Sequence, residues 1–253
     1  MIWLWRALVF AVLTILTQIG GVAWLAAVAI ARNQRLRVFL AVFLVVYVGL
    51  WGVTRFAAPS FDRVAIPCID NGPARARALS PLYCAMNRTY VTPEMAALAD
   101  ALAAHMHERF PGTRTRVLDA GFPFFNVPLL PHLSHDDGNK LDLAFWYEGG
   151  NWRSPIGYWA FEEPRSSDPR LCDDAPKVGL RWNMSAFQPF VRDLPLDEAR
   201  TATALRWLAE RLPDGGKVFI EPHLANRLGV TGQAIRFQGC RAARHDDHIH
   251  IQL

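Results

Sequence analysis

The first 60 residues contain no aspartate and no glutamate, although arginine occurs there at positions 6, 32, 35, 37 and 55. The whole chain has 27 Lys and Arg against 23 Asp and Glu. Residues 61–253 therefore hold 22 basic and 23 acidic side chains, and the pI near 9.1 comes from the N-terminal segment. A nucleic-acid-binding domain needs clustered basic side chains on its folded part, so we expect no nucleic-acid partner.

Cysteine is scarce, with four residues that all follow the first 60: Cys68, Cys84, Cys172 and Cys240. None of them forms a CxxC pair, which argues against a thiolate zinc site. An even number of cysteines in an exported domain indicates two disulfides. Four cysteines allow three pairings, which the sequence does not decide among. The short spacing favours Cys68 with Cys84, and elimination then pairs Cys172 with Cys240.

Charged side chains are missing from two apolar stretches, residues 7–31 and 38–54. A membrane-spanning helix needs roughly 17–25 apolar residues, so each stretch is long enough. Tryptophans at positions 3, 5 and 51 lie near the ends of these stretches, where indole rings favour the membrane interface. The sequence predicts that residues 1–56 form a two-helix transmembrane anchor, with residues 57–66 as a tether.

The loop between the two stretches contains three arginines within residues 32–37. Such loops stay in the cytoplasm, so we expect a multi-pass protein of the cytoplasmic (inner) membrane whose large C-terminal part faces the periplasm. A cleaved signal peptide ending within residues 26–31 is the alternative. Both interpretations place residues 67–253 on the same extracytoplasmic side.

Residues 67–253 have the length of one domain and contain no internal repeat. Thr92-Pro93-Glu94 is typical of a helix start, and that helix should end near Arg109; a second should run from about Asp197 to Leu212. Helices and strands do not alternate, which favours an α+β domain with a small central antiparallel sheet and flanking helices. The predicted strands cover residues 115–119, 141–147, 217–221, 235–238 and 248–253.

Five of the eight histidines fall in two short groups. The first is His132-x-x-His135, with Asp142 seven residues further on, and the second is His245-x-x-His248-x-His250 at the C-terminus. Imidazole and carboxylate groups are zinc ligands, and a catalytic zinc site uses three of them. On a strand, the side chains of His248 and His250 point to the same face, roughly 6.5–7 Å apart.

Simpler interpretations exist for each group taken alone. Histidine and aspartate on a polar surface are usually solvated, and Asp136 and Asp137 are typical turn residues before Gly138. Asp142, however, opens the apolar stretch LDLAFWY, where a buried carboxylate without a partner would be costly. The presence of both groups in one domain favours a metal site over coincidence.

The two groups together resemble the zinc-peptidase fold shared by lysostaphin, D-Ala-D-Ala metallopeptidases and the hedgehog signalling domain. The resemblance is closest to penicillin-insensitive murein endopeptidases, which have His-x-x-His before a Gly and an Asp, and then His-x-x-His-x-His. It covers about 17 residues. The added membrane anchor departs from that family, whose members are soluble periplasmic enzymes, and the segment 148–190 matches nothing in it.

The resemblance implies a role for each matching residue. His135, Asp142 and His250 correspond to the zinc ligands, and His248 corresponds to the histidine that acts as general base. His245 and His132 correspond to further site histidines. The implied reaction is hydrolysis of an amide bond in a peptidoglycan peptide, in which zinc polarises the carbonyl and activates a water molecule.

Residues outside the two groups are less informative. Glu221 ends a predicted strand, where it either orients a ligand histidine or lies on the surface. Trp182 and Trp207 are expected in the core; core packing is also the default for Trp152 and Trp159, with groove lining as the alternative.

The leading hypothesis is a membrane-anchored zinc metallopeptidase, either a murein endopeptidase or a D,D-carboxypeptidase. The alternatives are a non-catalytic zinc domain that binds a cell-wall or peptide ligand, and a structural domain with incidental histidines. The presence of His248 beside the three expected ligands favours the enzyme.

Overall fold

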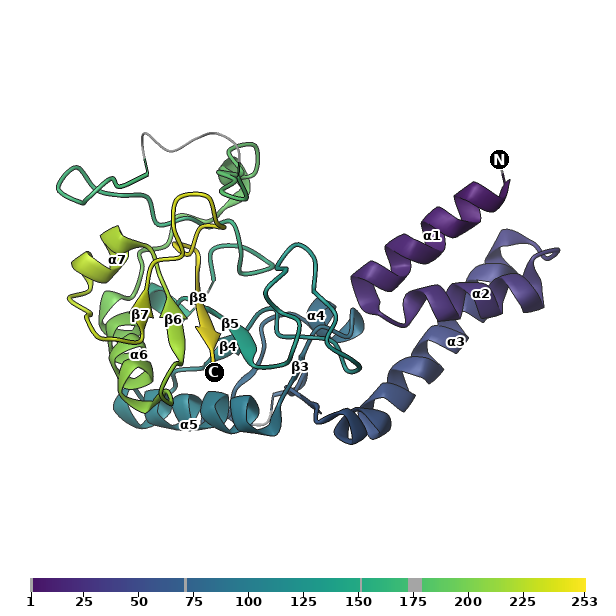
Figure 1. The fold of residues 1–253 in the computed structure, drawn as a ribbon, viewed down its shortest axis with the longest axis horizontal. Helices are drawn as coiled ribbons and strands as arrows, with labels where there is room; N and C mark the ends of the chain where they lie inside the picture. Colours follow the sequence, from purple (N-terminus) through teal and green to yellow (C-terminus); the bar gives the residue numbers. More distant parts are fainter. Residues whose placement is uncertain (1, 71, 151, 173–178) are drawn as a thin grey trace.

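A computed structural model describes residues 2–70, 72–150, 152–172 and 179–253. Two parts are evident in Figure 1: a group of N-terminal helices lies to one side of a mixed globular part. The N-terminus is at the far end of the helices, whereas the C-terminus ends a strand inside the globular part. The fold is mixed α and β, as the sequence predicts, with differences in the anchor and in the sheet.

The apolar N-terminal region forms three helices followed by a short 3-10 helix. These are α1 (Ile2–Thr17), α2 (Gly20–Ala31), α3 (Leu36–Ala57) and η1 (Ala58–Phe61). Among the described residues, the stretch Leu36–Phe61 is the one helical segment long and apolar enough to cross a membrane. The prediction of two spans is therefore wrong for residues 7–31. At 1.5 Å per residue, α1 and α2 reach about 24 and 18 Å, less than a hydrocarbon core of about 30 Å.

The break between α1 and α2 falls at Gln18, which has a left-handed backbone with φ +65°. Its side-chain amide donates to the carbonyl of Phe124 and accepts from the Phe124 N–H at 3.1 Å. Thr17 Oγ1 accepts from the N–H of Gly20, the first residue of α2, at 2.9 Å. The contacts of Gln18 to a loop distant in sequence explain why an unbroken apolar run does not form one helix.

A six-stranded sheet organises the globular part, in the order β2-β4-β5-β8-β6-β7. The strands are β2 (Arg77–Ala78), β4 (Arg116–Val117), β5 (Lys140–Ala144), β6 (Lys217–Phe219), β7 (Ile235–Arg236) and β8 (His248–Gln252). The four central strands are antiparallel, as predicted. The outer pairs β2–β4 and β6–β7 are parallel, so the sheet is mixed. Each parallel pair requires a crossover, which contains α5 between β2 and β4 and α7 between β6 and β7.

The remaining elements are short. A two-stranded antiparallel sheet joins β1 (Val64–Ala65), within the expected tether, to β3 (Tyr90–Val91). The short helices are α4 (Pro81–Ala85), α7 (Pro222–Arg227), η2 (Glu148–Gly150) and η3 (Gln188–Phe190). Both predicted disulfides are present, joining Cys68 to Cys84 and Cys172 to Cys240.

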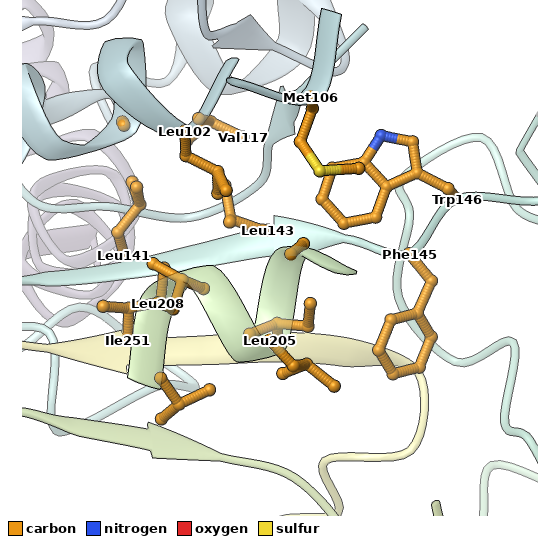
Figure 2. Close-up of a cluster of buried hydrophobic side chains, with 14 of the residues drawn as sticks. Leu102, Met106, Val117, Leu141, Leu143, Phe145, Trp146, Leu205, Leu208 and Ile251 are labelled. Atoms are coloured by element: carbon orange, nitrogen blue, oxygen red, sulfur yellow. The ribbon is translucent and has the colours of Figure 1, made fainter. Parts of the chain in front are cut away.

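Two helices cover one face of the sheet, and both begin where the sequence predicts. Helix α5 (Pro93–Arg109) is capped by Thr92, and α6 (Glu198–Arg211) by Asp197. Figure 2 shows Leu102 and Met106 of α5 and Leu205 and Leu208 of α6 meeting the apolar side chains of β5 and β8. The core therefore lies between the helices and this face of the sheet, which leaves the opposite face for polar residues.

Candidate metal centre

The pairing of β5 with β8 places the two histidine groups together. The register puts Asp142 opposite His250 and Ala144 opposite His248. Side chains alternate between the two faces of a strand, so these four residues point away from the helices. Directly opposite residues have Cβ atoms about 4.5–5.5 Å apart, which brings the Asp142 carboxylate within reach of the His250 ring.

His135 comes from the loop that leads into β5, and it is buried. Gly138 turns the chain between His135 and Asp142 with φ +79°, and an added Cβ would lie 2.6 Å from Nε of Arg63. Asp136 and Asp137 are turn residues, as predicted, and both bind the Lys140 ammonium.

The ring of His135 is oriented by a backbone carbonyl. His135 Nδ1 lies 2.6 Å from the oxygen of Ala120. A carbonyl oxygen can only accept a hydrogen bond, so Nδ1 carries the proton. The lone pair of Nε2 in the neutral ring therefore points toward Asp142 and His250.

Three ligand atoms converge at this point. His135 Nε2 lies 3.2 Å from Asp142 Oδ1 and 3.1 Å from His250 Nδ1, and His250 Nδ1 lies 2.6 Å from Asp142 Oδ1. Bonds of 2.0–2.2 Å in a tetrahedral site imply ligand separations of about 3.3–3.5 Å. The two distances from His135 Nε2 are close to that range. The His250 Nδ1–Asp142 Oδ1 distance would have to lengthen when a metal ion replaces the hydrogen bond between these atoms. His135 and Asp142 fall with His132 in one group of side chains that could hold a metal ion, and His250 falls with His245 and His248 in a second.

The second oxygen of Asp142 faces other groups. Tyr158 donates its hydroxyl proton to Asp142 Oδ2 at 2.6 Å. His132 Nδ1 and His248 Nε2 lie 3.4 and 3.7 Å from the same oxygen. Burial would raise the pKa of Asp142, but the rings of His135, His248 and His250 outweigh burial and hold it well below the usual range. Asp142 is therefore ionised at the centre of the site.

His248 is held by its neighbour in sequence. Its Nδ1 lies 2.5 Å from Asp247 Oδ1, which leaves Nε2 facing the centre of the site. Burial opposes the charged ring, but Asp142 and Asp247 outweigh it and raise the pKa of His248 to about 9. For His250 burial prevails over Asp142 and lowers the pKa to about 4. The two histidines of the HxH pair thus differ in charge.

His245 and Glu221 lie at the edge of the site. The His245 ring is buried beside those of His248 and His250, with centroids 5.0 and 5.5 Å away. Burial and the neighbouring histidines lower its pKa well below the usual value. Glu221 is buried, accepts from the backbone N–H of His245 at 3.2 Å and pairs with Arg181. It therefore holds the His245 backbone, and the surface alternative for Glu221 is wrong.

His132 lies on the opposite side of the centre. Its Nδ1 is 3.1 Å from Asp119 Oδ2, and its ring centroid is 4.8 Å from that of Tyr158. Asp119 also forms a two-point ion pair with Arg88, at 2.7 and 2.8 Å. Because both partners of this ion pair are buried, it fixes the wall against which His132 packs.

The candidate ligand atoms open into a cleft of about 230 Å³. It is lined by Asp142, His248, His250, His245 and His132, and also by Tyr158, Trp159, Phe161, Leu180 and Trp182. All the sequence-predicted site residues except His135 and Glu221 thus line one cavity. His135 lies behind it, with its side chain fully buried.

Sequence reasoning missed several residues of the site. Tyr158, Asp119 and Asp247 each contact a site residue directly, although no spacing pattern marked them. Asp247 lies inside the second histidine group, and that position was the available signal. The expectation that Trp182 is a core residue is wrong, since it is 54% exposed at the cleft.

Comparison with known proteins does not assign the chain. No protein-family model matches it. A search of curated proteins finds no significant match either.

Proposed function

We propose that this chain is a membrane-anchored zinc hydrolase that cleaves amide bonds in the stems or crosslinks of peptidoglycan. The observation that carries the proposal is the convergence of His135 Nε2, Asp142 Oδ1 and His250 Nδ1 within 3.2 Å, next to His248 and a cleft. The resemblance of the two histidine groups to murein endopeptidases supports the substrate class.

The donor set supports a catalytic rather than a structural metal site. Two imidazoles and one carboxylate leave a coordination position open, whereas a structural site has four protein ligands. Zinc held there would polarise the amide carbonyl and lower the pKa of water toward about 7. The same donor set also suits Fe²⁺, so elemental analysis of the purified protein identifies the metal.

His248 is the residue that moves the proton. With Nδ1 held by Asp247, it presents Nε2 to the cleft, 3.7 Å from Asp142 Oδ2. A divalent cation bound beside it would oppose the charged ring and lower the raised pKa of His248. The neutral imidazole would then take a proton from the attacking water and return it to the nitrogen of the leaving amine. His132 turns Nδ1 toward Asp119 and lines the same cleft.

The anchor in this proposal is α3, with Arg32 and Arg35 just before it and Arg37 in its first turn. Positive residues stay on the cytoplasmic side, so the globular part lies outside the cytoplasmic membrane, where peptidoglycan and disulfide-forming conditions occur together. A periplasm-dependent reporter fused after Leu253 should be active. Activity of a cytoplasm-dependent reporter at the same position would contradict the proposal.

The direct test uses the full chain, purified in detergent and loaded with Zn²⁺. It should bind about one equivalent of zinc and release peptide fragments from purified peptidoglycan, with the cleaved bond identified by mass spectrometry. His248→Ala is the matched inactive control. One equivalent of zinc without any product would instead favour a non-catalytic domain that binds a cell-wall ligand.

A further inference from the structure

Beyond the metal-binding atoms, the cleft has an apolar wall. The side chains that form it are Trp159, Phe161, Leu180, Trp182 and Met184. They come from the segment 148–190, which the two histidine groups do not include. The candidate metal centre therefore does not account for the presence of these apolar side chains in the cleft.

Trp159 has a backbone conformation that a bulky residue rarely adopts, with φ +68°. A left-handed backbone strains a non-glycine residue and persists where the surroundings impose it. Two hydrogen bonds impose it here: the Trp159 N–H donates to Asp247 Oδ2 at 2.6 Å, and its carbonyl accepts from the Gln188 side-chain amide. The indole packs on Phe187, with ring centroids 5.1 Å apart.

The same carboxylate also orients the proton-transfer residue. Asp247 uses Oδ2 for the Trp159 N–H and Oδ1 for His248 Nδ1, and its side chain is 3% exposed. One buried group therefore bonds both the backbone of Trp159 and the imidazole of His248. A ligand that contacts the indole lies at a set position relative to His248 Nε2.

The charge of the cleft limits what that ligand can be. Arg244 is the single lysine or arginine among the described residues that line it. Its guanidinium is already engaged by Asp246 at 2.9 Å and by Glu163 at 2.9 Å, and it lies over the ring of Phe161. Recognition of a free carboxylate needs an available cation or several N–H donors. This guanidinium is committed elsewhere, and the charged ring of His248 already faces the carboxylates of Asp247 and Asp142.

We propose that Trp159 is the platform of a subsite that receives an uncharged, apolar group of the substrate next to an internal amide bond. The proposal rests on the proposed function and narrows the choice between an endopeptidase and a carboxypeptidase. A carboxypeptidase must accept a free carboxylate beside the scissile bond, and this subsite does not. The cleft geometry thus assigns the chain to endo-cleavage.

Three hydroxamates probe the subsite without any turnover: acetohydroxamate, N-acetyl-leucine hydroxamate and succinic monohydroxamate. Binding to the zinc-loaded full chain in detergent is measured by calorimetry. Burial of the leucine side chain on the indole should make the leucine probe bind at least about tenfold tighter than acetohydroxamate. The succinic probe, which carries a carboxylate at that place, should bind no tighter than acetohydroxamate.

Trp159→Ala should abolish the preference for the leucine probe while leaving acetohydroxamate affinity and zinc content unchanged. The matched control is Trp207→Ala, which removes an indole that stacks on His105, outside the cleft lining, and should keep the preference. A preference that survives Trp159→Ala, a succinic probe that binds tightest, or no hydroxamate binding at all would overturn the subsite. Failure of the proposed function has a different signature, namely bound zinc without peptidoglycan cleavage.

Thermal unfolding tests the backbone strain separately. Trp159→Gly should melt about 2–4 °C above Trp159→Ala, because glycine adopts a positive φ without strain. Equal melting temperatures would show that Asp247 and Gln188 do not hold Trp159 in a strained conformation. The proposal that Trp159 is a fixed platform would then be wrong.

Discussion

The two faces of the β5–β8 pair are opposite in chemistry, although their residues alternate along the same two strands. One face carries Leu141, Leu143, Ile249 and Ile251 and packs against α5 and α6 (Figure 2). The other carries Asp142, His248 and His250, all of them buried. Both faces exclude water, so burial alone does not distinguish a core from a site.

The energetics of the two faces differ in sign. Burial of an aliphatic side chain stabilises the fold by about 1.5–3 kcal/mol. Burial of a carboxylate is unfavourable without partners, and Asp142 needs Tyr158 and two histidines around it. Burial of the apolar face therefore stabilises the fold, whereas burial of the polar face destabilises it. The polar face instead holds a set of candidate ligand atoms in place. Four predictions test this difference.

The largest effect is expected for the ligand atoms on the polar face. His135→Ala, Asp142→Ala and His250→Ala should each lose the metal, because a three-ligand site tolerates no missing ligand. His248→Ala should keep about one equivalent and lose hydrolysis by about 10²–10⁴-fold. Elemental analysis and peptidoglycan digestion measure both properties. If His248→Ala is the variant that empties the site, the two roles are reversed.

The buried ion pair behind the polar face should have the next largest effect. Asp119→Asn leaves Arg88 without a countercharge and should lower the free energy of unfolding by about 3–5 kcal/mol, measured by urea denaturation. Burial raises the pKa of Asp119, but His132 and Arg88 outweigh it and hold that pKa below 3.8. A carboxyl group whose pKa is lower in the folded state than in the unfolded state stabilises the fold at pH values above its unfolded-state pKa.

The contribution of Asp119 should therefore disappear as the pH falls from 3.8 through the lower folded-state pKa. The wild type and Asp119→Asn should then converge in stability under acid. A gap between the two proteins that stays constant from pH 6 to pH 2 would show that the loss is one of packing and not of charge.

On the apolar face, Leu143→Ala should destabilise the protein by about 2–5 kcal/mol through a cavity between the sheet and the helices. Its neighbour in sequence is the ligand Asp142, yet zinc content at low temperature should stay near one equivalent. Calorimetric unfolding combined with elemental analysis gives both values. Loss of zinc from the folded Leu143→Ala protein would mean that the two faces are not independent.

The smallest effect is expected at the end of β8, where the Gln252 side-chain amide nitrogen lies 3.0 Å from His250 Nε2. The amide nitrogen donates to Nε2 in this arrangement. With a metal on Nδ1 the ring would carry its proton on Nε2, and the amide, turned over, would accept that proton through its oxygen. Gln252→Ala should weaken zinc binding by about 10–100-fold without emptying the site. Competition with a zinc chelator measures this change, and an unchanged affinity would show that the β-strand alone orients the ring.

Local signals predicted the elements that begin with their own cap. Thr92 and Asp197 define the starts of α5 and α6, because each side chain accepts a hydrogen bond from its own first turn. The five predicted strands were found as well, because period-two alternation is a local property. The parallel outer pairs were not predicted, because strand direction depends on crossovers that bring distant segments together.

The first apolar stretch shows the limit of hydropathy. Composition alone makes residues 7–31 a single span, but Gln18 bonds to Phe124, more than a hundred residues away. Those two hydrogen bonds stabilise a break that hydropathy does not encode. The structure thus has one spanning-length helix among the described residues instead of the two expected.

The sequence by itself determined which residues could bind a metal, because residue type sets ligand chemistry and the His-x-His spacing sets a common strand face. It also determined the compartment we propose, through the charge asymmetry of the first 60 residues. Tertiary structure alone decided how these residues meet: the β5–β8 register joins Asp142 to His250, and the 148–190 segment brings Tyr158 and Trp159 beside them. The contacts of Asp142 with His250 and of Trp159 with Asp247 join positions 108 and 88 residues apart, and no local propensity specifies them.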